Sequence, residues 1–172
     1  MELLTQLTRK KGTIVKMWFD KVIDSYPLDT AQFLKSQKDP FNNPVGQTTF
    51  QGLDTIFDML SGDIDRQKAK ACIDPIIRIR AIQDFTPARA VGFVFELKGI
   101  LRAMLLKGDD PRTLREFQTL ELRIDELSLA AFDVYMQCRE KLYDLQANEM
   151  KARTYSAFSR AGLIKESDEV TS

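Results

Sequence analysis

Apolar residues recur every three or four positions along almost the whole chain, which is the spacing of one face of an α-helix. No stretch alternates apolar and polar residues long enough to predict a β-strand. The pattern therefore predicts an all-α fold. The first segment shows it with Leu3, Leu4, Leu7, Ile14, Val15, Trp18, Phe19, Val22 and Ile23.

Proline, glycine and capping residues divide this pattern into about six helices. Pro75 is expected to kink or restart the fourth of them, because proline lacks an amide hydrogen. Thr86 before Pro87, and Asp109 or Asp110 before Pro111, predict helix starts, since their side-chain oxygens accept from free first-turn amides. The expected helices cover about 3–25, 28–37, 44–60, 65–84, 86–107 and 111–161.

The last predicted helix carries two apolar lines. Leu122, Leu129, Met136 and Tyr143 are spaced by seven, and a second set steps by three and four. A helix with two apolar lines is expected to be buried on more than one side, so it should pack into the domain and also against a second copy of the chain. The candidates for this dimer contact are Phe117, Leu120, Ile124, Leu127 and Val134.

Composition and charge limit the function classes. The chain has 172 residues, of which 44% are apolar and 29% charged, so we expect one ordered domain over 1–165 with a loose polar tail at 166–172. Its 25 basic residues balance its 25 acidic ones, which gives no general attraction to nucleic acid or to an anionic membrane. No signal peptide and no membrane span are visible, and a cytoplasmic location is expected.

The chain contains no histidine, which removes the commonest general base, zinc ligand and haem ligand. Cys72 and Cys138 lie far apart and form no CxxC motif, so we expect two buried thiols. Motifs for phosphate, dinucleotide or calcium binding are missing. We therefore predict no metal and no cofactor, and a catalytic role is disfavoured.

The stretch "RIRAIQDFTPARAVGFVF" from Arg78 to Phe95 has two interpretations. Its charged residues form a solvated helix face, with Asp74 and Arg78 paired four apart. Alternatively, Arg80 and Gln83 turn inward to hold the loop before Thr86 or to bind an anion. Asp84 belongs to the same junction and is a third candidate.

Small residues follow this junction. Gly92, Gly99 and Ala103 share one helix face, and glycine inside a helix costs about 0.8–1.0 kcal/mol relative to alanine. We expect either a closely packed neighbouring helix or a cavity for a small apolar ligand. Phe95 is expected in the core beside them and is, with Gly92 and Gly99, a candidate for lining such a pocket. Trp18 lines either the core or the pocket.

Several segments together resemble one family: Trp18 with Tyr26-Pro27, then "FLKSQKDPFNNPVG", then "RIRAIQDFTPARAVGFVFELKGILR". They are similar to the N-terminal domain of RsbT co-antagonist proteins, the RsbRD-type sensor module of bacterial stress signalling. The resemblance covers about 14–143. It implies a globin-like helical sensor without haem, often paired through its final helix.

In multidomain relatives the module precedes a STAS domain that enters stressosome assemblies and helps to control the kinase RsbT. The sequence ends at Ser172, so we expect a module that stands without a STAS domain. The resemblance therefore implies a non-enzymatic sensory or regulatory module that passes its signal to a separate partner, such as a STAS-domain protein. A carrier or sensor of a small apolar ligand is the alternative.

Overall fold

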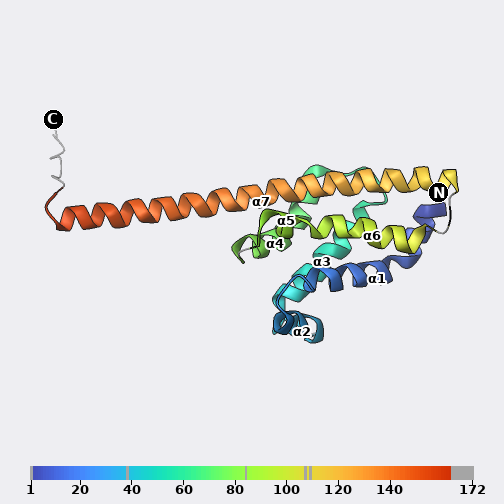
Figure 1. Cartoon of the computed structure of the whole chain (residues 1–172), viewed down its shortest axis with the longest axis horizontal. Helices are drawn as coiled ribbons and strands as arrows, with labels where there is room; N and C mark the ends of the chain where they lie inside the picture. Colours follow the sequence, from blue (N-terminus) through green and yellow to red (C-terminus); the bar gives the residue numbers. More distant parts are fainter. Residues whose placement is uncertain (1, 38, 84, 107, 109, 164–172) are drawn as a thin grey trace. The chain divides into compact units, whose positions relative to one another are not determined.

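The computed structural model describes residues 2–37, 39–83, 85–106, 108 and 110–163. Within these residues the fold is all-α, with no strand, as the apolar spacing predicts (Figure 1). The helices are α1 (Glu2–Ile23), α2 (Leu28–Ser36), α3 (Pro44–Met59), α4 (Arg66–Ile82), α5 (Pro87–Val91), α6 (Phe93–Leu105) and α7 (Pro111–Arg160).

Two helix boundaries differ from expectation. Pro75 lies inside a continuous α4 and does not restart it. The helix expected over 86–107 divides at Gly92 into α5 and α6. The amide of Phe95 bonds the Gly92 carbonyl at 3.0 Å, a three-residue step that tightens the turn. A Cβ at Gly92 would lie 2.6 Å from the Ala88 carbonyl oxygen, so this turn requires glycine.

Side-chain caps begin the helices where the sequence predicts them. The Thr86 hydroxyl accepts from the Arg89 amide, and Pro87 follows as the first residue of α5. The Asp110 carboxylate accepts from the Thr113 amide at 2.8 Å before α7. Asp65 caps α4 in the same way. These bonds satisfy amides that have no partner within the helix.

The loop between α2 and α3 is organised by the buried side chain of Asn43. Its Nδ2 donates to the carbonyls of Leu34 and Gln37, both at 2.9 Å, and its Oδ1 accepts from the Gly46 amide at 2.8 Å. A Cβ at Gly46 would lie 2.4 Å from the Asn43 Nδ2, so only glycine fits beside this amide. The "NNPVG" segment therefore serves to join α2 to α3.

Contacts divide the chain into two compact units, Met1–Met136 and Gln137–Ser172. In the first unit α1 packs against both α3 and α6, and α3 packs against α4. This core is formed by fully or almost fully buried side chains, among them Leu7, Ile14, Trp18, Leu53, Ile73, Ile77, Leu97 and Leu101.

The described part of the second unit is the final stretch of α7 and the turn after it. Gly162 ends the helix with φ 67°, and the Leu163 amide bonds back to the Phe158 carbonyl at 3.0 Å. Such a left-handed glycine is the common end of an α-helix. The predicted tail at 166–172 lies outside the described residues.

Candidate functional site

The first unit buries an arginine at the junction of α1, α4 and α5. Arg80 is 1% exposed, and its Nη2 donates to the Ser25 hydroxyl and to the Arg89 carbonyl, both at 2.9 Å. The Arg80 guanidinium carbon lies 4.3 Å from the centre of the Phe85 ring. The centre of the Tyr26 ring lies 5.5 Å from the same guanidinium carbon. This Arg80 cluster ties the end of α1 to the segment that connects α4 to α5.

In this cluster burial disfavours the charged forms of Arg80 and Tyr26, whereas the interaction between the two side chains favours them. Burial lowers the pKa of Arg80 and raises the pKa of Tyr26, because both lose water around their charged forms. The nearby Tyr26 hydroxyl favours the charged arginine, and the arginine in turn favours the tyrosinate. A guanidinium nevertheless stays protonated in proteins. The cluster therefore holds a permanent buried positive charge.

A polar pocket of about 260 Å³ opens beside Arg80. Arg89 forms part of its wall and donates from Nη2 to the Ser25 carbonyl at 2.7 Å. Lys21 and Glu96 line it too, as an ion pair with 3.0 Å between Nζ and Oε2. Its remaining wall is formed by Val22, Ser25, Ala88, Gly92 and Phe93.

An apolar groove of about 520 Å³ lies between the α5–α6 segment and α7, within the first unit. Phe95, Leu129 and Phe132 contribute large side chains to it, and all three are about half exposed. Gly92 lines both the groove and the polar pocket. The tight turn at Gly92 thus separates two hollows of different chemistry.

The predicted pocket residues occupy different environments. Trp18 is fully buried in the core, and its Nε1 donates to the Phe93 carbonyl at 2.7 Å. Arg80 turns inward, as the second interpretation of its stretch expects. Gln83 does not, because it is exposed at the end of α4. Asp84 lies outside the described residues.

Two further expectations for this region are wrong. Phe95 is 49% exposed and lies at the groove instead of in the core. Gly99 is exposed, and a Cβ there would meet none of the described atoms within 4 Å, so none of the described helices packs against it. Gly92 is different, because its glycine requirement comes from the Ala88 carbonyl within its own turn. The strip of small residues is therefore not a helix-packing face.

The expected dimer candidates are also misplaced. Each is at most 2% exposed within the first unit, so a second chain cannot reach them without unfolding that core. A seam spaced by three and four looks the same whether it faces its own domain or a partner. The buried residues in question are Phe117, Leu120, Ile124, Leu127 and Val134.

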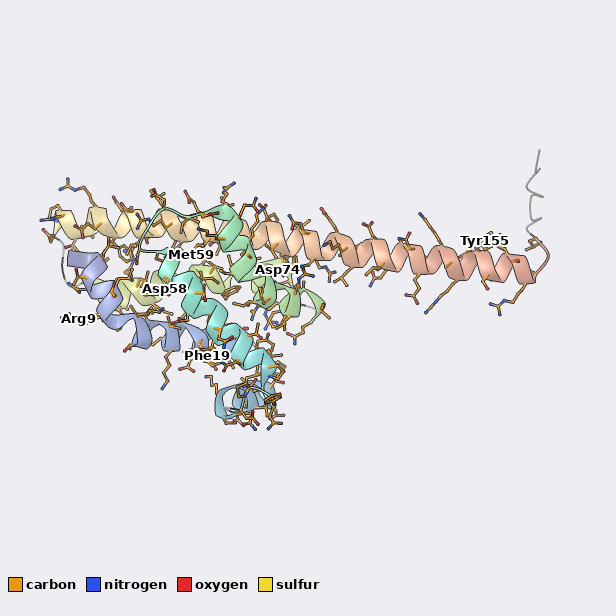
Figure 2. All side chains as sticks on the ribbon, turned by 180° about the vertical axis from the view of Figure 1, so that it is seen from behind. Arg9, Phe19, Asp58, Met59, Asp74 and Tyr155 are labelled. Carbon is orange, nitrogen blue, oxygen red and sulfur yellow. The ribbon has the colours of Figure 1, made fainter. Side chains whose placement is uncertain are left out.

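The other line of α7 is exposed. In the first unit Leu122, Leu129 and Phe132 are 66%, 56% and 46% exposed, and Met136 is 38% exposed. In the second unit the large apolar side chains also face solvent, and Figure 2 shows Tyr155 projecting from the helix. The exposed set there comprises Tyr143, Leu145, Met150, Tyr155, Phe158 and Leu163.

The remaining sequence expectations concern thiols, metals and membranes. Cys72 and Cys138 are partly exposed, not buried, and partial burial raises the pKa of the Cys72 thiol. Over the residues that the structure describes, no group of three acidic or cysteine side chains could hold a metal ion. None of the described helices is long and apolar enough to cross a membrane.

Sequence reasoning missed the partners of Arg80. Ser25 and Arg89 lie 55 and 9 residues away along the chain, and the sequence singled out neither of them as a partner of Arg80. Tyr135 was missed as well: its hydroxyl donates to the Phe85 carbonyl at 3.2 Å and so joins α7 to the Arg80 cluster. The one available signal was the concentration of aromatic and basic residues in the quoted stretch.

Comparison with known proteins places the chain in a family. The sequence profile described as "RsbT co-antagonist protein rsbRD N-terminal domain" matches residues 12–150. An uncharacterized protein of Archaeoglobus fulgidus is 26% identical over 153 residues, which cover 85% of this chain and 87% of that protein. No solved structure matches the chain. With its profile match spanning most of the sequence, the chain belongs to the RsbRD N-terminal domain family of RsbT co-antagonist proteins.

Proposed function

We propose that this chain is a non-enzymatic regulatory module of stress-type signalling that acts in the cytoplasm through protein–protein contacts. Membership of the RsbRD N-terminal domain family supports a regulatory role. The observation that carries the protein–protein part is the exposed apolar line of α7. Large apolar side chains cluster on protein surfaces mainly where a partner covers them.

The partner that fits this line best is a second copy of the chain. Leu122, Leu129 and Met136 follow each other at seven-residue steps, the repeat of helices that pair in coiled coils. Tyr143 and Met150 continue the same step in the second unit. An isolated helix with exposed apolar side chains is marginal in water, and pairing would stabilise it. A homodimer through α7 would cover the apolar line and would stabilise the helix that carries it.

A chain of contacts connects this surface to the Arg80 cluster. Tyr135 lies next to Met136 on α7 and holds the Phe85 carbonyl, while the Phe85 ring covers the Arg80 guanidinium. A change at the cluster would therefore alter what α7 presents to a partner. This gives the module a route from a signal to an interaction surface.

Analytical ultracentrifugation of the full chain tests the dimer. We expect a dimer at high micromolar concentration, and we expect Leu129→Glu to raise the dimer dissociation constant about tenfold or more, which corresponds to about 1.4 kcal/mol. Thr119→Glu is the matched control, because it adds the same charge at an exposed polar position of α7. A wild-type chain that stays monomeric at high micromolar concentration rules the dimer out.

The downstream partner that we propose is a separate STAS-domain protein. A pull-down from the native cell with the tagged full chain tests it, with the Leu129→Glu variant run in parallel. Recovery of a STAS-domain protein supports the stress-signalling role. Recovery of a metabolic complex, with no STAS-domain protein present, contradicts it.

The apolar groove favours a second candidate function, the binding of a small apolar ligand. Its lining by Phe95, Leu129 and Phe132 is largely apolar, and its volume suits a small molecule. Leu129 and Phe132 belong to both the groove and the exposed line, so ligand and partner would compete. Native mass spectrometry of the purified chain tests this candidate, and a chain that carries no bound molecule counts against it.

A further inference from the structure

Arg80 is a buried cation whose hydrogen-bonding capacity is only partly used. Its Nη2 has two acceptors, the Ser25 hydroxyl and the Arg89 carbonyl. Its Nε and Nη1 are buried and have no hydrogen-bond partner among the described residues. A buried charge is unfavourable unless it is paired and its donors are satisfied. Among the residues that the structure describes, the Arg80 guanidinium therefore has no acceptor that carries negative charge.

The surrounding side chains do not supply that charge. Three aromatic rings face the guanidinium, those of Phe85, Tyr26 and Phe93, and such rings attract a cation more weakly than a carboxylate does. Of the described residues that line the adjacent pocket, only Glu96 carries a carboxylate, and it is already paired with Lys21. Within the described residues, no ion pair to Arg80 is formed.

The polar pocket carries an excess of positive charge. Its described lining includes the cations Lys21, Arg80 and Arg89 and, of the carboxylates, only that of Glu96. It also includes Ser25, whose hydroxyl can donate or accept. A volume of about 260 Å³ admits a small molecule together with water. The charge, the donors and the space all match a small anion.

We propose that this pocket binds a small oxyanion, a carboxylate or a phosphate, whose oxygens pair with the Arg80 guanidinium. The planar guanidinium presents its donors in the geometry that both kinds of oxyanion accept. Binding neutralises the buried charge and changes the contacts of Ser25 and Arg89 at the junction of α1 and α5. Binding of an anion here requires neither the proposed dimer nor the proposed partner.

The test is a titration of the isotope-labelled full chain followed by nuclear magnetic resonance. Sodium acetate and sodium phosphate are the two probes, each added at constant ionic strength against sodium chloride. We expect one of them to produce saturable shifts of the Arg80 Nε–H signal and of the Ser25 and Gly92 amides. Saturation by acetate assigns the site to carboxylates, and saturation by phosphate assigns it to phosphates. Linear or absent shifts with both anions overturn the proposal.

Variants test whether the pocket itself is responsible. Arg80→Gln should abolish the saturable shifts. Because this core variant can fail to fold, Lys21→Glu at the exposed rim provides a second test, and we expect it to weaken binding several-fold by reversing one pocket charge. Lys16→Glu is its matched control on the same helix, outside the pocket, and should leave the affinity unchanged. Equal affinities in wild type and Lys21→Glu overturn the proposal.

Discussion

The indole nitrogen of Trp18 donates a hydrogen bond of 2.7 Å to the carbonyl oxygen of Phe93, and the two rings stack with centroids 6.2 Å apart. Both side chains are buried, Trp18 on α1 and Phe93 at the start of α6. Phe93 also lines the polar pocket, and its ring faces Arg80. This pair therefore holds α6 against α1 at the point where the candidate site begins.

Trp18→Phe should lower the free energy of unfolding by about 1–3 kcal/mol, because it removes a buried hydrogen bond and leaves a small cavity. Urea denaturation followed by circular dichroism measures this loss. Fluorescence is unsuitable because Trp18 is the only tryptophan. Met17→Ala, at a 39% exposed neighbouring position, should stay within about 0.5 kcal/mol of wild type. Equal losses in both variants would contradict the assigned role of Trp18.

The two glycines of the α5–α6 region predict opposite effects of the same substitution. Gly92→Ala should destabilise the chain by about 1–3 kcal/mol, because its Cβ would lie 2.6 Å from the Ala88 carbonyl oxygen. Gly99→Ala should stabilise it by about 0.5–1 kcal/mol, because Gly99 lies within α6 at an exposed position where a Cβ has room. Thermal and urea unfolding of both variants measure the difference. Destabilisation by both would show that Gly99 has a packing role.

The helices were predictable because their ends depend on nearby residues. A cap such as Thr86 before Pro87 involves atoms within three positions, and so does the Asn43 cap before Pro44. The division at Gly92 escaped prediction because a glycine inside an apolar helix has several explanations. Its cause, a close approach to the Ala88 carbonyl, is visible only in three dimensions.

The candidate site was less predictable, since burial depends on contacts between distant segments. Arg78 and Arg80 lie two apart in one helix, yet Arg78 pairs with Asp74 at the surface while Arg80 is enclosed. Ser25 and Phe85, which enclose Arg80, come from other segments. The sequence allowed both interpretations of the stretch, and neither arginine alone could decide between them.

The sequence likewise did not show which of the two apolar lines of α7 is buried and which is exposed. Substitutions on each line distinguish the two. Ile124→Ala should lower the free energy of unfolding by about 2–5 kcal/mol, because Ile124 is fully buried. Leu122→Ala, on the exposed line, should change it by less than about 0.5 kcal/mol. Both are measured at low protein concentration, so that association does not add to stability. A large loss in Leu122→Ala under these conditions would contradict its assignment to the free surface.

The start of α7 predicts a dependence of stability on acid pH. Hydrogen bonds from the Thr113 hydroxyl and amide to the Asp110 carboxylate, at 2.7 and 2.8 Å, lower the pKa of Asp110 below its ordinary value. The folded state therefore holds this proton less tightly than the unfolded chain, whose aspartate pKa is about 3.9. The resulting stabilisation is complete above that value and is lost as the pH falls through the folded pKa.

Asp110→Asn keeps a residue that can cap a helix but removes the titrating group. The difference in unfolding free energy between wild type and this variant should consequently shrink as the pH falls below about 4. Urea denaturation at a series of acid pH values measures it. Asp63→Asn, at an exposed position that caps none of the described helices, serves as the control for the loss of one aspartate charge. A difference that stays constant from neutral to acid pH would mean that the Asp110 cap does not depend on its charge.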